Sequence, residues 1–118
     1  MKSLHNFSGI YIFRDPVDMR KSYDGLSALV QASFGEQLFD GTLFVFRSKR
    51  SNALKMLYWN GSGYAIWMTR LEEERFHWPK NFQGHSLDLS AEQIEWMLNG
   101  FDITKMKAHK RLDYQTGA

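Results

Sequence analysis

Three aspartates, Asp15, Asp18 and Asp24, fall in one short N-terminal segment. Carboxylates that converge on a pair of divalent cations are what a metal-dependent nuclease or strand-transfer enzyme requires. Asp18 is equally suited to cap a helix, and residues 42–59, which read as strands, contain no acid that would complete such a site. The chain has no cysteine, and its histidines show no metal-ligand spacing: His5, His77, His85 and His109. We therefore predict no catalytic residue, metal or cofactor, and a protein that is not an enzyme.

A basic segment is the clearest candidate for binding chemistry. Arg47, Lys49, Arg50 and Lys55 give it a net charge of +4, without an acid, in a chain whose total is +2. Several cations on one rigid turn would form a salt-sensitive, sequence-neutral contact with nucleic-acid phosphates, because binding releases condensed counterions. A solvated loop tip explains the same residues without a ligand, so both interpretations stay open. Arg70 or the basic C-terminal residues would extend a phosphate contact.

A β-hairpin would position this basic segment. Residues 42–46 and 54–59 flank it and are rich in aromatic and branched apolar side chains, as strands are. The link at residues 60–63 tolerates positive φ and leads to a third such run at residues 64–69. The three runs predict an antiparallel meander.

Alternation along residues 54–59 puts apolar side chains on both faces of that sheet. Such a sheet needs cover on both sides, from its own helices on one and from a partner on the other. Trp59 and Trp67 are expected in the core, with base stacking beside Lys and Arg as the alternative.

Further elements are predicted on either side of the meander. Residues 9–14 read as a central strand because they are apolar on both faces. Asp18 is expected to cap a helix that ends at Gly35, with Gly25 packed closely against the sheet. The apolar stripe of this helix comprises Met19, Tyr23, Leu26, Leu29 and Val30.

In the C-terminal part, residues 76–78 read as a short strand that Pro79 stops. Ser90 and Gln93 have the spacing of a capping box, so a second helix should run from there towards Gly100. The predicted fold class is α+β: a four- or five-stranded, mainly antiparallel sheet with two or three packed helices.

Length and composition set the remaining expectations. A chain of 118 residues can bury a core, so residues 1–103 are predicted to form a single domain. Residues 104–118 would be a basic tail or helix; it carries Lys105, Lys107, Lys110 and Arg111. Without cysteines, a signal peptide or an apolar stretch long enough for a bilayer, the expected location is the cytoplasm.

Several stretches together resemble a known family. They are Pro16–Leu26, Leu43–Arg50 running into Leu54–Trp59, Arg70–Glu72, Arg75–Pro79, and a closing segment from Leu89 to Asp102. In this order and spacing the chain resembles the TnpB (Orf2) accessory protein of IS-sixty-six-type insertion sequences. The family-motif positions are Asp18, Met19, Arg20, Asp24, Gly25, Trp59, Arg75 and Pro79. The resemblance implies a small bacterial protein that assists transposition beside a separate, larger transposase.

The hypothesis is thus a non-enzymatic transposition accessory that contacts DNA phosphates through Arg47, Lys49, Arg50, Lys55 and Arg70. The alternative is a protein adaptor that binds the transposase, or a second copy of itself, without touching DNA. The expected partners are DNA and the proteins of the same element, with no membrane.

Overall fold

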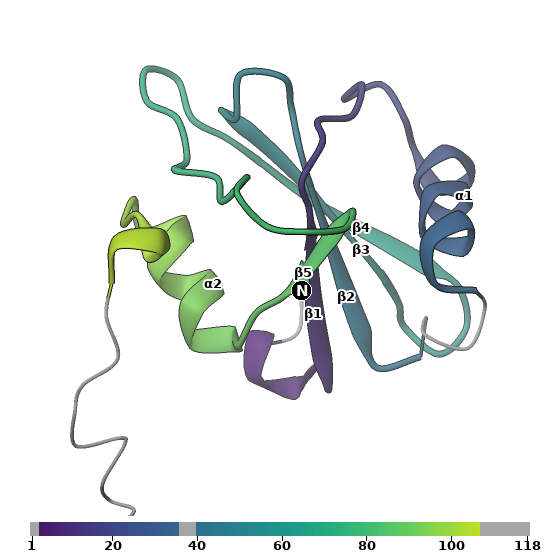
Figure 1. The fold of residues 1–118 in the computed structure, drawn as a ribbon. Helices are drawn as coiled ribbons and strands as arrows, with labels where there is room; N and C mark the ends of the chain where they lie inside the picture. Colours follow the sequence, from purple (N-terminus) through teal and green to yellow (C-terminus); the bar gives the residue numbers. More distant parts are fainter. Residues whose placement is uncertain (1–2, 36–39, 107–118) are drawn as a thin grey trace, which may run out of the picture.

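The computed structural model describes residues 3–35 and 40–106. Five strands form one sheet in the order β4-β3-β2-β1-β5, and Figure 1 shows α1 and α2 on opposite sides of it. The strands are β1 (Gly9–Phe13), β2 (Thr42–Arg47), β3 (Ala53–Trp59), β4 (Tyr64–Arg70) and β5 (Ser86–Asp88). The helices are α1 (Tyr23–Phe34) and α2 (Ala91–Leu98), with short 3-10 turns η1 (Leu4–Asn6) and η3 (Ile103–Lys105).

The α+β prediction is confirmed, with a sheet that is mixed. β2, β3 and β4 form the predicted antiparallel meander, and β5 pairs antiparallel with β1. β1 and β2 are parallel. Parallel neighbours require a crossover long enough to return the chain to the same end of the sheet, and α1 supplies it. β1 lies between β2 and β5, which is the central position predicted for it.

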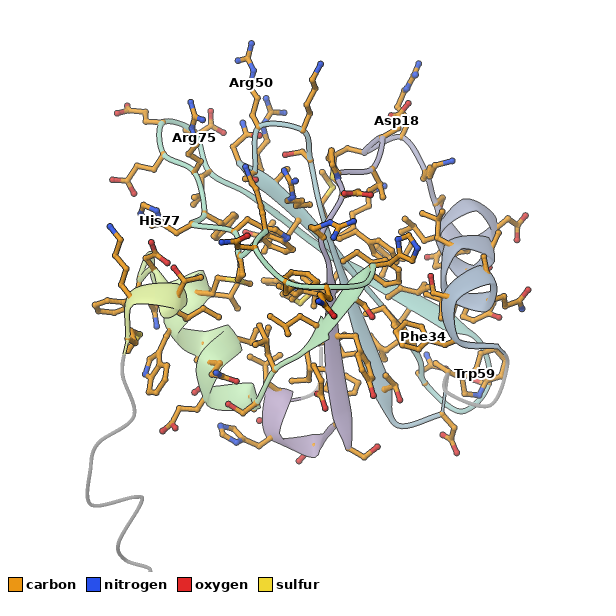
Figure 2. The ribbon with its side chains drawn as sticks, viewed as in Figure 1. Asp18, Phe34, Arg50, Trp59, Arg75 and His77 are labelled. Atoms are coloured by element: carbon orange, nitrogen blue, oxygen red, sulfur yellow. The ribbon has the colours of Figure 1, made fainter. Side chains whose placement is uncertain are left out.

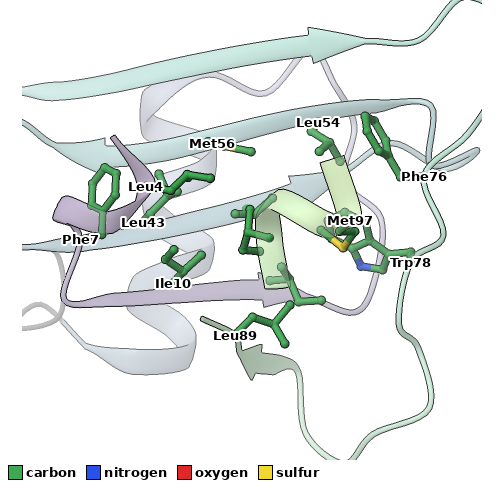
Figure 3. Packing of buried hydrophobic residues seen from close by; sticks show 13 residues of the cluster. Leu4, Phe7, Ile10, Leu43, Leu54, Met56, Phe76, Trp78, Leu89 and Met97 are labelled. Atoms are coloured by element: carbon green, nitrogen blue, oxygen red, sulfur yellow. The ribbon is translucent and has the colours of Figure 1, made fainter. Parts of the chain in front are cut away.

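The chain's own elements cover both faces of the sheet over its central strands, β1, β2 and β3. The alternation predicted for β3 is observed: Leu54 and Met56 pack on the α2 face, whereas Leu57 packs on the α1 face. Figure 3 shows the larger cluster, where Ile10, Leu43 and Met97 fill the space between the sheet and α2. Over β1, β2 and β3 no partner is needed to cover a sheet face, contrary to the expectation from sequence, whereas Trp67 and Met68 of β4 remain exposed.

The first helix begins later than predicted. α1 starts at Tyr23 after Ser22, so Asp18 does not cap it; Asp18 instead accepts from the backbone N–H of Arg20 at 2.9 Å. Met19 therefore precedes the helix, and Tyr23 is exposed, while Leu26 and Val30 are buried as expected. Gly35 ends the helix at a φ of 85°, as predicted.

Two further expectations were wrong. The nearest atoms to a Cβ built at Gly25 belong to the Lys21 side chain, at 3.2 Å, and not to the sheet. Residues 76–78 form an extended segment rather than a strand, and the fifth strand is β5. The alternation of buried and exposed side chains in residues 76–78 indicates an extended chain. A strand also requires a neighbouring strand with which to exchange backbone hydrogen bonds.

The capping box at the start of α2 is confirmed, with the Gln93 N–H donating to Ser90 Oγ and the Ser90 N–H to Gln93 Oε1. Residues 104 and 105 of the expected tail belong to η3, whereas Lys107, His109, Lys110 and Arg111 lie outside the described residues. Within residues 3–35 and 40–106, no helix has the length and apolar character needed to cross a bilayer.

Candidate nucleic-acid interface

The connection between β2 and β3 is an ordered tight turn. The Ser51 N–H donates to the Ser48 carbonyl at 3.0 Å, so Lys49 and Arg50 occupy the two central positions and are exposed. Ser48 Oγ accepts from the backbone N–H groups of Asn52 and Ala53 at 3.2 and 3.1 Å. These local bonds fix the direction in which the two cations project.

Arg47 differs from the expectation that it belongs to the exposed basic tip. Only 6% of its surface is exposed. Its Nε and Nη2 donate to the Arg14 carbonyl at 3.0 and 2.8 Å, and its Nη1 donates to Ser51 Oγ at 3.1 Å. Burial lowers the pKa of the Arg47 guanidinium, and the nearby charge of Asp15 opposes this. Arg47 therefore ties the turn to the end of β1 and is not available at the surface.

The segment after β4 carries a second set of basic side chains beside the β2–β3 turn. Phe76 and Trp78 are buried, and they anchor this extended segment against the sheet. The Phe76 N–H donates to the Ser51 carbonyl at 2.7 Å, and Trp78 Nε1 donates to the Phe13 carbonyl at 2.9 Å. Because side chains alternate along an extended chain, Arg75 and His77 face outward.

The β2–β3 turn and the segment after β4 line a groove of about 600 Å³. Four cationic side chains line it, together with His77 and one carboxylate, Asp102. The cations are Lys49, Arg50, Arg75 and Lys80. Figure 2 shows Arg50 and Arg75 extending from the same end of the molecule, with His77 beside them. We call this set of lining residues the basic groove.

Asp102 is the acid among the residues that line the basic groove. Its carboxylate accepts hydrogen bonds from the backbone N–H and hydroxyl of Thr104. The side-chain bond from Thr104 is the largest influence lowering the pKa of Asp102, and partial desolvation opposes it. Asp102 is thus ionised at neutral pH, and the groove retains a clear excess of positive charge.

Lys55 and Arg70 are not among the residues that line the groove. Lys55 is half-buried, and its Nζ donates to the Lys21 carbonyl at 2.7 Å. Arg70 is exposed at the end of β4. Of the predicted phosphate-binding residues, the structure therefore brings Lys49 and Arg50 together and separates them from Arg47, Lys55 and Arg70.

Asp15 and Asp18, which precede α1, each pair with a nearby arginine. Asp18 binds the guanidinium of Arg20, with Oδ2 2.6 Å from Nη2, and this hydrogen bond is the main cause of a pKa for Asp18 far below its usual range. Asp15 pairs with Arg14 at 3.3 Å. No three His, Asp or Glu side chains are grouped to hold a metal ion anywhere in residues 3–35 and 40–106.

The other family-motif positions have varied surroundings. Trp59 is half-buried and meets Tyr64 edge to face, with ring centroids 5.1 Å apart. Asp24 is exposed in the first turn of α1, and Pro79 is buried beside the basic groove. Only Arg75 among these positions lines the groove.

Lys80 was not identified from the sequence as a binding residue, and Arg75 was singled out only through the family resemblance. The alternation of Phe76 and Trp78 with Arg75 and His77 was a usable signal, because it places the latter pair on the solvent side. No sequence signal indicates that this segment would lie against the β2–β3 turn.

The comparisons with known proteins identify the family. The family model described as "IS66 Orf2 like protein" matches residues 8–108. Protein y4jC of Sinorhizobium fredii, described as uncharacterized, is 36% identical over 98 residues, which cover 83% of each chain. Protein y4hO of the same organism, with the same description, is 32% identical over 93 residues, which cover 79% of this chain and 80% of y4hO. No solved structure matches the chain. The chain therefore belongs to the IS66 Orf2-like family of transposition accessory proteins.

Proposed function

We propose that this protein is a non-enzymatic transposition accessory that binds the phosphate backbone of DNA through the basic groove. The observation that carries the proposal is the lining of that groove. Its volume is about 600 Å³, and four Lys and Arg side chains but only one carboxylate line it. Lys and Arg contacts to phosphates hold a protein on DNA without reading its sequence. The role is therefore to hold or position element DNA for a separate transposase.

The ordering of the groove supports this role. The turn that carries Lys49 and Arg50 is held internally and by Arg47, and the segment that carries Arg75 is anchored by buried aromatic side chains. Cations carried on an ordered backbone lose less chain freedom on binding than cations on a mobile segment.

The test is fluorescence anisotropy of labelled duplex DNA over a salt series. Four neutralised phosphates predict that log affinity falls with log salt at a slope of about −3.6, at roughly −0.9 per phosphate on duplex DNA. Arg50→Ala and Arg75→Ala should each weaken binding and reduce the steepness by about 0.9. Their thermal unfolding midpoints should match that of the wild type because both side chains are exposed.

Arg20→Ala is the matched control, since it removes an exposed guanidinium that already pairs with Asp18 outside the groove. It should leave the slope unchanged. Scrambled duplex should bind as tightly as the element's terminal repeat if phosphate contacts dominate. Absence of binding at low salt, or equal effects of Arg20→Ala and Arg50→Ala, would refute the proposal.

A protein adaptor is the second candidate function. The covered sheet faces no longer support it, but β4 exposes Trp67 and Met68, at 36% and 48% of their surfaces, along a sheet edge. Co-purification of the transposase that survives nuclease treatment and high salt, and that is lost in Trp67→Lys, would favour the adaptor over the DNA-binding role.

A further inference from the structure

The outer side of β4 is an uncovered sheet edge. β4 ends the strand order, and within residues 3–35 and 40–106 no strand pairs with its outer side. Its seven residues pair without interruption to β3, from Ala53↔Arg70 to Trp59↔Tyr64, so no bulge twists this edge away. Proteins usually protect such edges with charges, prolines, bulges or covering segments. β4 carries neither a proline nor a charge before Arg70.

The hydrogen-bond pattern identifies the backbone groups that point outward. The Asn60 N–H donates to Gly63 O at 2.9 Å, and the Leu71 N–H donates to Asn52 O at 2.7 Å. Because bonded and non-bonded pairs alternate in an antiparallel ladder, Ala65, Trp67 and Thr69 bond to β3. The N–H and C=O groups of the intervening Ile66, Met68 and Arg70 are directed to the outer edge.

We propose that this edge pairs with the β4 of a second copy of the chain, antiparallel and centred on Trp67. This register is the one that pairs all seven residues of β4. It also places Ile66 opposite the partner's Met68, so outward-pointing backbone groups meet outward-pointing backbone groups. The strand is therefore complementary to itself in hydrogen bonding.

Side-chain chemistry also fits a two-fold pair. Trp67 meets its own copy in a non-bonded pair, where Cα atoms approach to about 4.5 Å and aromatic pairs are favourable. The exposed Met68 covers the partner's Ile66 on the α1 face. The charge of β4, Arg70, meets the partner's Tyr64, and the two Arg70 side chains lie about 20 Å apart at opposite ends. No like charges oppose each other within the paired strands.

The pairing would join two sheets into one continuous sheet. The basic groove lies at the end of β4 that contains Arg70, next to the β2–β3 turn. Antiparallel pairing would therefore put the two grooves at opposite ends of the joined β4 strands. Bridging of two DNA segments follows only if the proposed function holds, whereas the pairing itself does not depend on DNA.

Light scattering after size exclusion tests the pairing on the full chain. The wild type should have about twice the chain mass of 13.9 kDa, at concentrations from micromolar upwards. Trp67→Lys and Trp67→Glu should each be monomers, because each places like charges opposite each other at the two-fold axis. An equimolar mixture of the two should regain the dimer. The control Met106→Lys changes another exposed side chain and should remain dimeric.

Cross-linking tests the register, and the absence of native cysteines makes it unambiguous. Trp67→Cys should form an intermolecular disulfide on oxidation, because the two Cα atoms fall within disulfide range. Arg70→Cys should not, at about 20 Å. Circular dichroism melting confirms that each variant is folded.

A folded wild type that stays monomeric throughout the concentration series would overturn the proposal, and so would equal cross-linking of the two cysteine variants. A monomer that captures the transposase only when Trp67 is intact would likewise overturn it and assign this edge to the transposase. Failure of the DNA titration with the dimer intact would refute the proposed function alone.

Discussion

Arg47 offers the most direct test of how charge is used in this chain. Arg47→Met keeps an unbranched stem of similar length but removes three hydrogen bonds, two to the Arg14 carbonyl and one to Ser51 Oγ. Hydrogen bonds from charged groups are worth about 1.5–3 kcal/mol each before burial of the charge is counted. The lowered pKa of Arg47 shows that burial opposes the charged form, so part of this gain is already offset.

The net loss on Arg47→Met is therefore expected to be about 2 kcal/mol, dominated by the Arg14 carbonyl left without its two donors. For a chain of this size, that loss lowers the thermal unfolding midpoint by about 8 °C. Urea unfolding followed by tryptophan fluorescence measures the free energy directly.

Arg50→Met is the matched control, because Arg50 is three residues further along and exposed. It should change the free energy of unfolding by no more than about 0.5 kcal/mol. Equal unfolding midpoints for the two variants would refute a structural role for Arg47. A more stable Arg47→Met would show that the cost of burying the charge exceeds the value of its bonds.

Two further predictions concern other contacts. The pKa of Asp18 is lowered, so stabilisation from its ion pair is fully present above the ordinary value of 3.8 and is lost as pH falls below it. Arg20→Ala should return the Asp18 titration, followed by carboxyl NMR, towards that ordinary value, and an unchanged titration would contradict the pairing. Trp78→Phe should destabilise the protein by about 1 kcal/mol, because the buried Phe13 carbonyl loses a 2.9 Å hydrogen bond. Chemical unfolding measures this loss, and an unaltered midpoint would argue against the bond.

Much of the fold was predictable because its signals are local. The meander follows from three apolar runs and a glycine-containing turn, and the start of α2 follows from the spacing of Ser90 and Gln93. The predicted start of α1 was wrong because Asp18 has the carboxylate of a helix cap, but that carboxylate accepts a hydrogen bond from the backbone N–H of Arg20 in the turn before the helix. An Asp in a turn and an Asp at a helix start use the same hydrogen bond, so the residue type alone does not distinguish them.

The site was only partly predictable. Lys49 and Arg50 were identified because they lie in the hairpin connection, where exposure follows from local geometry. Lys55 is close to them in sequence, but its side chain lies on the α1 face of the sheet, where its Nζ donates to the Lys21 carbonyl. Neighbours along a strand alternate between faces, so closeness in sequence does not place two charges on one surface.

The sequence by itself determined the family, because motifs in a fixed order along most of the chain carry the resemblance. It also determined the strand pairing of the meander and the presence of an exposed basic turn, because both depend on patterns within a few residues. The tertiary structure alone decided which cations share a surface. Phe76 and Trp78 dock on the core and bring Arg75 and Lys80 against the β2–β3 turn, while Arg47 turns inward to the Arg14 carbonyl. These choices depend on which distant segments pack together, and that is settled by the whole core rather than by any local pattern.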